Sequence, residues 1–274
     1  MIAKTIQQDL TGNTFEEVAL SLLKQHEPPE GYYLAFSGGK DSIVIYDLAV
    51  RAGVKFTAHF NMTTVDPPEV LQFIKDNYPE VIWTRPIKSM FRLIVERGTP
   101  PTRHRRYCCR ELKEIGGKGK TVILGIRAAE SARRKNRKPY EESRIDKGKF
   151  FVNPILSWSD KDVWTYIRTR GLKYPSLYDQ GRKRIGCVLC PLQSKRGRIR
   201  DLEDFPKFRK AYLIAFRKML EKIESEGKSA PNNWKTAEDV MNWWIHGDKK
   251  DPIHSRSRKN NKKRRDKPLL DISV

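Results

Sequence analysis

A glycine-rich stretch, SGGKDS, stands at residues 37–42, directly after a short apolar run and directly before a segment with the apolar spacing of a helix. Two glycines let backbone N–H groups converge on an anion without a side chain in the way. A helix that begins near the end of the stretch adds its positive N-terminal end, and the lysine adds a point charge. We therefore predict that this stretch binds phosphate groups through Ser37, Gly38, Gly39, Lys40, Asp41 and Ser42.

Asp41 would repel a phosphate that it faced, so we expect it to cap the helix or to help hold Mg²⁺ on the phosphates. The stretch is not a Walker A loop, because Asp41 stands where Ser or Thr is required. The segment GGKGKT at 116–121 also fails, because Glu114 replaces the first glycine and the segment precedes a strand. A G-x-G-x-x-G fingerprint is absent, so neither a P-loop kinase nor a dehydrogenase is indicated.

The cysteines form one neighbouring pair and one C-x-x-C pair: Cys108, Cys109, Cys187 and Cys190. The first ten residues lack the apolar core of a secretion signal, so structural disulfides are not expected. We predict that the four thiols bind a metal, either zinc or an iron–sulfur cluster. Neighbouring side chains diverge, which is awkward around a single zinc ion but suits the separate iron atoms of a [4Fe–4S] cluster.

Strands and helices alternate along residues 31–171. The apolar pattern predicts strands at 32–36, 55–60, 81–84, 121–125 and 150–153, and helices at 14–25, 41–52, 65–78, 88–97 and 157–171. This alternation indicates an α/β fold with a parallel sheet and helices on both faces. Helices near 203–225 and 236–245 follow, and we expect them to form a small C-terminal helical lobe.

We expect four segments: an N-terminal helix and lead-in at 1–30, a nucleotide-binding domain at 31–171, a helical lobe with the C-x-x-C at 172–246, and a basic disordered tail at 247–274. A formal net charge of +22 would attract polyanions such as nucleic acid, although a solvated basic surface is the alternative. No run of eighteen apolar residues exists, so we expect no membrane partner and a cytoplasmic location.

Several motifs together resemble one enzyme family. SGGKDS after a strand resembles the PP-loop of the ATP-pyrophosphatase superfamily, and the paired cysteines resemble the cluster-binding pattern of iron–sulfur sulfonucleotide reductases. Three further segments resemble the phosphoadenosine phosphosulfate (PAPS/APS) reductase family: GIRAAESARR at 125–134, NPILSWSDKDVWTYI at 153–167 and SLYDQGRKRIGCVLCPL at 176–192. The resemblance implies the adenine nucleotide alpha hydrolase-like fold of that superfamily.

The resemblance also implies roles for individual residues. Catalytic roles fall on Lys40, Asp41, Arg127 and Glu130. ATP or an adenylyl sulfonucleotide, with Mg²⁺, is bound by residues 37–42, Arg127 and Arg134, and loosely by the loop 66–69. A structural salt bridge is the alternative for Arg127 and Glu130. Trp158 and Trp164 are expected in the core. The [4Fe–4S] cluster is held by Cys108, Cys109, Cys187 and Cys190.

The sequence departs from the reductase pattern at one point. Reductases resembling this family use a further thiol on a Glu-Cys-Gly-like segment, and these 274 residues contain no fifth cysteine. We therefore favour an enzyme that adenylates a nucleic acid, DNA or tRNA, and supports sulfur transfer, together with a sulfur-donor or reductant protein. A PAPS/APS reductase with its thiol supplied in trans and a non-catalytic nucleic-acid-binding module are the alternatives.

Overall fold

The computed structural model describes residues 12 and 14–247 and contains a six-stranded sheet in the order β3-β2-β1-β4-β6-β5. The strands are β1 (Tyr32–Ala35), β2 (Phe56–Asn61), β3 (Ile82–Thr84), β4 (Thr121–Ile123), β5 (Tyr140–Glu142) and β6 (Phe150–Val152). All neighbouring pairs are parallel except β5 and β6. The predicted α/β class is confirmed, with the unpredicted edge strand β5 making the sheet mixed.

Residues group into two compact units. Unit 1 holds the described residues up to Leu93 together with Arg103–Cys190, and unit 2 holds Ile94–Thr102 and the described residues from Pro191 onward. The helices are α1 (Phe15–Gln25), α2 (Lys40–Ala52), α3 (Pro68–Asn77), α4 (Met90–Arg97), α5 (Ala132–Lys135), α6 (Asp160–Arg170), α7 (Lys195–Asp204), α8 (Pro206–Ser225) and α9 (Ala237–His246). A π-helix spans Cys109–Lys113, and 3₁₀ turns span Ala128–Glu130 and Pro231–Asn233.

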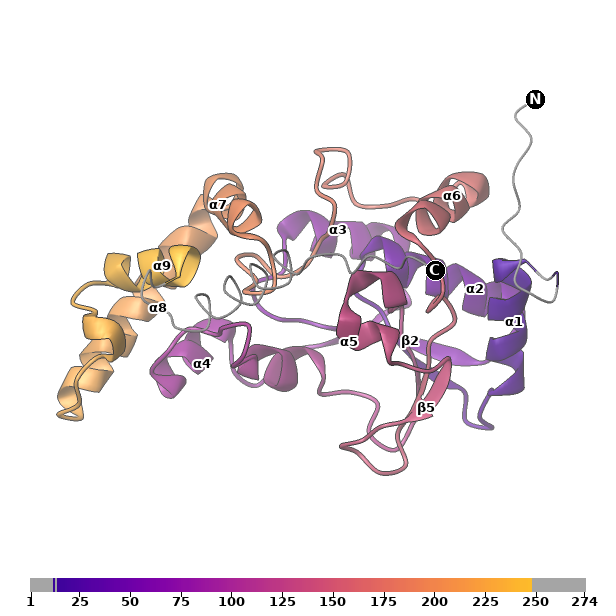
Figure 1. Cartoon of the computed structure of the whole chain (residues 1–274), viewed down its shortest axis with the longest axis horizontal. Coiled ribbons are helices and arrows are strands. Elements are labelled where there is room, and N and C mark those ends of the chain that lie inside the picture. Colours follow the sequence, from indigo (N-terminus) through magenta and orange to yellow (C-terminus); the bar gives the residue numbers. More distant parts are fainter. Residues whose placement is uncertain (1–11, 13, 248–274) are drawn as a thin grey trace, which may run out of the picture. The chain divides into compact units, whose positions relative to one another are not determined.

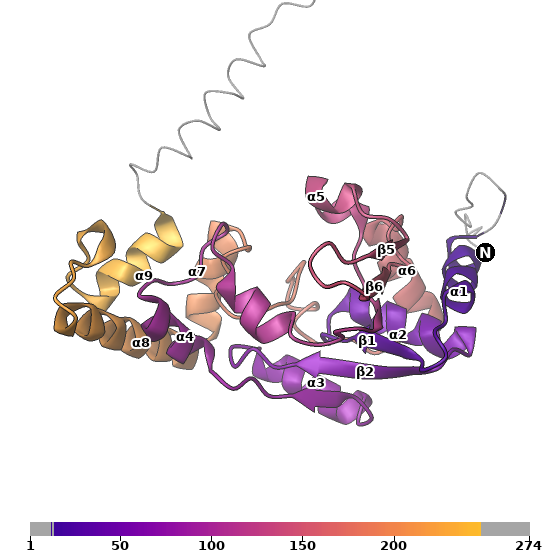
Figure 2. The same ribbon diagram turned by 90° about the horizontal axis from the view of Figure 1, so that it is seen from below.

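The core of unit 1 is built on β1 and α2. Tyr32 and Leu34 of β1 are buried, and Ile43, Ile45 and Leu48 of α2 have no exposed surface. Helix α2 packs beside α1 and α6, as Figures 1 and 2 show. Because both sides of the loop 36–39 are anchored in this buried layer, the loop between them has little freedom to move.

Helix α6 begins and ends where its sequence predicts. Ser159 caps the first turn by accepting the backbone N–H of Asp162, and the Asp162 carboxylate accepts the N–H of Ser159 in return. Gly171 ends the helix in the left-handed region, with φ at 61°. Trp158, just before the cap, is 3% exposed and packs on Tyr166, which confirms its expected place in the core.

Unit 2 contains α7, α8 and α9, drawn from orange to yellow in Figure 1. Trp244 of α9 lies against the buried rings of Tyr212 and Phe216 on α8, and its indole N–H donates to the carbonyl of Pro101 at 2.6 Å. The sequence analysis missed α7, because KRGRIRDLED is largely charged and includes a glycine. Arg198 of α7 donates to the carbonyls of Trp244 and Ile245 at the end of α9, a contact that local patterns do not reveal.

Three expectations from the sequence concern membrane spans, the C-terminal tail and the domain boundary. Among the described residues, none of the helices combines the length and apolar character needed to cross a membrane. The basic tail expected at 247–274 lies outside the described residues, apart from Gly247. The domain boundary expected after residue 171 stays a prediction, while the two compact units divide after Cys190.

Candidate active site

The glycine-rich loop lies where parallel sheets commonly bind ligands. It follows β1, which has β2 on one side and β4 on the other, so the strand order reverses here. The segment 124–127 follows β4 at the same edge of the sheet. A Cβ atom on Gly125 would lie 2.8 Å from the carbonyl oxygen of Asp41, so only glycine permits this approach of the two loops.

The two glycines of the loop meet different constraints. Gly38 has φ at +69°, and a Cβ there would lie 2.9 Å from Val70 and Ile74 of α3. Gly39 has φ at −83°, and a Cβ there would meet only Ser37 Oγ and Tyr178 Oη, both at 3.5 Å. The protein's own packing therefore requires glycine at 38 but not at 39.

Two buried cations and two carboxylates converge at the start of α2. Lys40 and Arg127 are each 4% exposed. Lys40 Nζ lies 3.3 Å from Asp41 Oδ2 and 3.2 Å from Asp160 Oδ1. Arg127 Nε donates to Asp41 Oδ1 at 2.6 Å, and its Nη2 donates to Asp160 Oδ1 at 3.1 Å. The structure thus brings the predicted Lys40, Asp41 and Arg127 together and adds Asp160, which the sequence analysis missed.

The first backbone N–H of α2 also has a partner. Lys40 N donates to the hydroxyl of Tyr178 at 2.9 Å, Ser42 Oγ donates to the Gly39 carbonyl at 2.8 Å, and Ser37 Oγ lies 3.3 Å from Ser42 Oγ. Burial, followed by the charges of Asp41 and Asp160, raises the pKa of Tyr178, so its phenol stays protonated at neutral pH. The sequence analysis quoted the segment that contains Tyr178 but assigned this residue no role.

Glu130 and Arg134 are connected to the site indirectly, because Glu130 contacts Arg127 and Arg134 contacts Glu130. The Glu130 carboxylate accepts the backbone N–H of Arg127 at 2.9 Å and forms an ion pair with Arg134. Burial and the positive charges of Arg184, Arg127 and Arg137 lower the pKa of Arg134. Glu130 therefore holds the segment after β4 in shape, and Arg134 adds to an excess of positive charge beside it.

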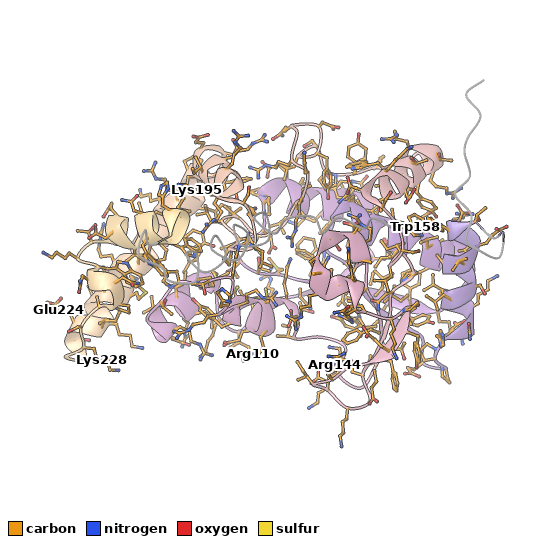
Figure 3. The ribbon with its side chains drawn as sticks, in the orientation of Figure 1. Arg110, Arg144, Trp158, Lys195, Glu224 and Lys228 are labelled. Carbon is orange, nitrogen blue, oxygen red and sulfur yellow. The ribbon has the colours of Figure 1, made fainter. Side chains whose placement is uncertain are left out.

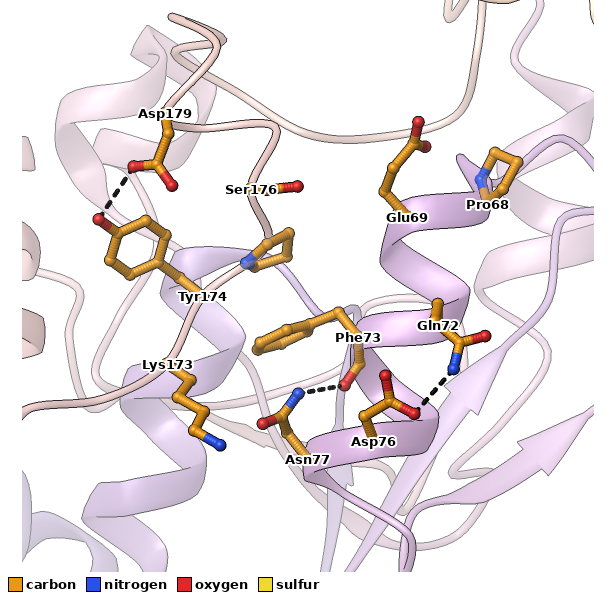
Figure 4. A pocket seen from close by; sticks show the side chains of 11 residues that line it. Pro68, Glu69, Gln72, Phe73, Asp76, Asn77, Lys173, Tyr174, Ser176 and Asp179 are labelled. Atoms are coloured by element: carbon orange, nitrogen blue, oxygen red, sulfur yellow. Dashed lines mark hydrogen bonds between the residues drawn. The ribbon is translucent and has the colours of Figure 1, made fainter.

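In the loop after β2, the Asp66 side chain is bound to the backbone of the loop itself. Asp66 is 7% exposed and accepts the N–H of Thr63 at 2.6 Å, and its burial raises its pKa. Glu69, at the start of α3, lines an open groove of about 950 Å³ together with Phe73 and Tyr174 (Figure 4). Within the loop 66–69, Asp66 thus organises the backbone, whereas Glu69 borders open space.

The two cysteine pairs come from distant parts of the sequence. Cys108 and Cys109 lie at the start of the π-helix, while Cys187 donates to Thr63 Oγ1 at 3.4 Å. The backbone N–H of Val188 donates to the Val65 carbonyl at 2.7 Å, which fixes the C-x-x-C segment to the loop after β2.

The four thiols influence one another's ionisation. A hydrogen bond between Cys108 and Cys109 lowers the pKa of Cys109 and raises that of Cys108, which the charges of Cys187 and Cys190 raise further. Burial raises the pKa of Cys187 to about 11. In the described part of the chain, no three His, Cys, Asp or Glu side chains are arranged to hold a metal ion. Thiolates are the ligand type that iron–sulfur clusters take, so the residue types suit a cluster although this arrangement does not gather them around one.

Comparison with known families decides among nucleotide-binding folds. Residues 31–193 match the phosphoadenosine phosphosulfate reductase domain. The chain belongs to this family. The match extends from β1 through the C-x-x-C segment, so it includes the glycine loop, the segment after β4 and all four cysteines. The adenine-nucleotide-binding PP-loop fold expected from the motifs is the fold of this phosphoadenosine phosphosulfate reductase domain.

Relatives of this reductase family include enzymes of sulfonucleotide reduction. The chain is 26% identical over 206 residues to adenosine 5′-phosphosulfate reductase 2 of Bacillus subtilis, which covers 69% of this chain and 84% of that protein. It is 30% identical over 207 residues to an uncharacterised protein of Methanocaldococcus jannaschii, across 70% of this chain and 50% of that relative. A second uncharacterised protein of that organism is matched over 44% of its length, so the chain spans about half of these two relatives.

Among solved structures, the phosphoadenylyl-sulfate reductase of Candida auris, a phosphate complex, aligns with a TM-score of 0.49 and 17% identity over 66% of this chain and 97% of that one. The FMN adenylyltransferase of Candida glabrata aligns with a TM-score of 0.47 and 14% identity over 64% of this chain and 62% of that one.

Proposed function

We propose that this chain binds ATP, adenylates a nucleic acid with release of pyrophosphate, and supports delivery of sulfur to the adenylated position. The observation that carries the proposal is the pair of buried cations, Lys40 and Arg127, at the N-terminus of α2. Buried cations need counter-charges, which Asp41 and Asp160 supply here and which the oxygens of a polyphosphate can also supply. The electrostatic stabilisation of a leaving pyrophosphate is the contribution that this arrangement makes best.

The charged residues of the loop and of the segment after β4 have different parts in this reaction. Lys40, Arg127 and the backbone at the start of α2 bind the β- and γ-phosphates, and they stabilise the charge that develops as the bond from the α-phosphorus breaks. Asp41 keeps Arg127 in place through its 2.6 Å contact and offers an oxygen to Mg²⁺. Glu130 orients the backbone of Arg127, and Arg134 attracts the substrate's phosphates.

The cysteines would hold a [4Fe–4S] cluster, through Cys108, Cys109, Cys187 and Cys190. When bound, the cluster would supply structural support or a relay for sulfur. The protein's own contribution is to fix the C-x-x-C segment to the loop after β2. If all four cysteines hold the cluster, these 274 residues contain no thiol that could attack a sulfonucleotide.

A nucleic-acid substrate is favoured by the surface charge. The chain carries a formal +22, and exposed cations such as Arg110 and Arg144 project outward from unit 1 (Figure 3). The segment from Arg133 to Lys138 follows the site residue Arg127 closely, so positive charge continues from the phosphate-binding loop onto the surface. A small sulfonucleotide does not need so extended a basic surface.

The decisive experiment measures release of pyrophosphate, the product of the adenylation step, which needs no sulfur donor. Anaerobically purified protein is incubated with ATP and Mg²⁺ in the presence of DNA, tRNA or neither. We expect release only with a nucleic acid, and a loss of roughly 10²–10³-fold in Lys40→Ala. Lys75→Ala, which removes an exposed lysine on α3, is the matched control and should retain activity. Absence of release with every nucleic acid tested would contradict the proposal.

A second candidate follows from the family match and the Bacillus subtilis relative. We propose it as the alternative: reduction of adenylyl or phosphoadenylyl sulfate with the attacking thiol supplied by another protein. The same phosphate site would then hold the sulfonucleotide. Formation of sulfite from either sulfonucleotide in the presence of thioredoxin supports this candidate, and its absence together with nucleic-acid-dependent release of pyrophosphate supports the first.

A further inference from the structure

Asp160 stands out among the groups around Lys40 and Arg127, because its carboxylate is 62% exposed while both cations are buried. One of its oxygens, Oδ1, touches both cations, at 3.2 Å from Lys40 Nζ and 3.1 Å from Arg127 Nη2. A single oxygen between a lysine and an arginine is the position that an oxygen of a bound phosphate takes in such sites.

Asp41 occupies the other side of the same pair and is held more firmly. Its side chain is 21% exposed, and its two oxygens each contact a different cation. Asp160, in contrast, sits at the first position of α6 and has open water beside it, so it can turn away at little cost. Of the two carboxylates, Asp160 is therefore the one that can leave.

We propose that Asp160 is a stand-in for a phosphate oxygen, which neutralises Lys40 and Arg127 in the ligand-free protein and is displaced when the phosphates bind. This inference rests on the proposed nucleotide-binding role of the loop. It makes Asp160 a specificity-determining residue: a ligand must bring enough negative charge to replace a carboxylate on two cations. Polyphosphates meet that requirement, whereas a singly charged anion does not.

Tyr178 satisfies a third phosphate-binding group of the same site. Its hydroxyl accepts the first N–H of α2, which is also a group that phosphate oxygens commonly contact. Oxygens of the protein therefore satisfy both the backbone donor and the two cations at the helix start. Such a site keeps its cations in place before the ligand arrives, and part of the binding free energy is used to displace Asp160.

The test compares two substitutions on the same helix that remove the same charge. Asp160→Asn removes the displaced carboxylate, and Asp162→Asn removes a neighbouring carboxylate that is hydrogen-bonded with Ser159. Binding of inorganic pyrophosphate to the full chain is measured by calorimetry. We expect Asp160→Asn to tighten binding by about tenfold, since a partly screened like charge is removed, and Asp162→Asn to change it by less than about twofold.

Thermal unfolding gives a second measurement, in which the rise of the melting temperature with pyrophosphate distinguishes the proposed role from a merely structural one. Without ligand, Asp160→Asn should unfold about 2–4 °C below wild type, because two buried cations lose a partner. With saturating pyrophosphate, its melting temperature should rise by more than that of wild type. Asp160→Ala should behave in the same way, which provides a second variant if the asparagine does not fold. Adding Lys40→Ala to Asp160→Asn should abolish the gain in affinity.

Equal or weaker pyrophosphate binding by both Asp160 variants would overturn the inference, and so would a failure of wild type and variants alike to bind. The readout needs neither adenylation nor sulfur transfer. Tighter binding in Asp160→Asn without pyrophosphate release from ATP on any nucleic acid would therefore overturn the proposed function and leave this inference standing.

Discussion

The glycine loop and the four-cysteine region lie in the same unit but satisfy their polar groups in different ways. In the loop, carboxylates and a phenol already contact Lys40, Arg127 and the first N–H of α2. In the cysteine region, a hydrogen bond with Cys109 raises the pKa of Cys108, and burial raises the pKa of Cys187. The loop is thus electrostatically complete without a ligand, whereas the thiols gain most from a positively charged metal that removes their protons.

The largest effects are expected from substitutions that remove iron binding or pyrophosphate binding but not both. If the four cysteines hold the proposed [4Fe–4S] cluster, anaerobically purified wild type should contain about four iron atoms per chain, and Cys187→Ser should lose them because one of four ligands is removed. It should still bind pyrophosphate, since Lys40 and Arg127 do not contact the cysteines in any described interaction. Iron and sulfide analysis, an EPR spectrum and calorimetry measure these quantities.

Lys40→Ala is the reciprocal variant and should keep its iron while losing pyrophosphate binding. If either variant loses both properties, the two regions act as one site and are not independent. A colourless wild-type protein with one bound zinc ion would remove the cluster from the proposal and leave the loop unaffected.

The second effect tests how far the loop is fixed by its own packing. Gly38→Ala should destabilise the protein by roughly 2–4 kcal/mol, since a left-handed backbone costs about 1–2 kcal/mol and crowding against Val70 and Ile74 adds more. Gly39→Ala is the matched control and should change the free energy of unfolding by less than about 1 kcal/mol. Urea unfolding measures both. Equal destabilisation would show that the loop conformation is not what requires glycine at 38.

The sequence could predict the parts of the site that depend on local patterns, but not the contacts between distant residues. The loop, its flanking strand and helix, and the caps of α6 are local patterns, so residues such as Gly39 and Ser159 are readable from their neighbours. Tyr178 lies 138 residues from Lys40, and its contact depends on how α6 and the following segment return to α2. Asp160 was overlooked for the same reason, because a charged residue at a helix start has a sufficient local explanation.

A smaller effect is expected for the phenol at the start of α2. Tyr178→Phe removes the acceptor of the Lys40 N–H and should destabilise the ligand-free protein by about 1 kcal/mol, an effect that bound pyrophosphate should reduce. Tyr174→Phe removes a hydroxyl of the same aromatic cluster that donates to Asp179 at the groove (Figure 4), and it should leave stability unchanged. Thermal unfolding with and without pyrophosphate distinguishes them. An identical response of both variants would mean that the Tyr178 hydroxyl does not serve the loop.

The smallest effect concerns the strand that supports the cysteine region. Asn61 of β2 donates to the carbonyl of Lys113 at the end of the π-helix, and His59 on the same strand stacks on Tyr33 with ring centres 4.0 Å apart. Burial, followed by the positive charge of Lys120, lowers the pKa of His59 below its ordinary value of 6.5. The folded protein therefore favours neutral His59.

This stabilisation should be present above about pH 6.5 and should be lost as the pH falls through the lowered pKa, because the unfolded chain then binds a proton that the folded protein resists. Replacing His59 by Gln should reduce the loss of stability between pH 7.5 and pH 5 by a few tenths of a kcal/mol, since the ring is only partly buried. Urea unfolding at both pH values measures this difference. A variant that loses as much stability as wild type on acidification would place the pH dependence elsewhere.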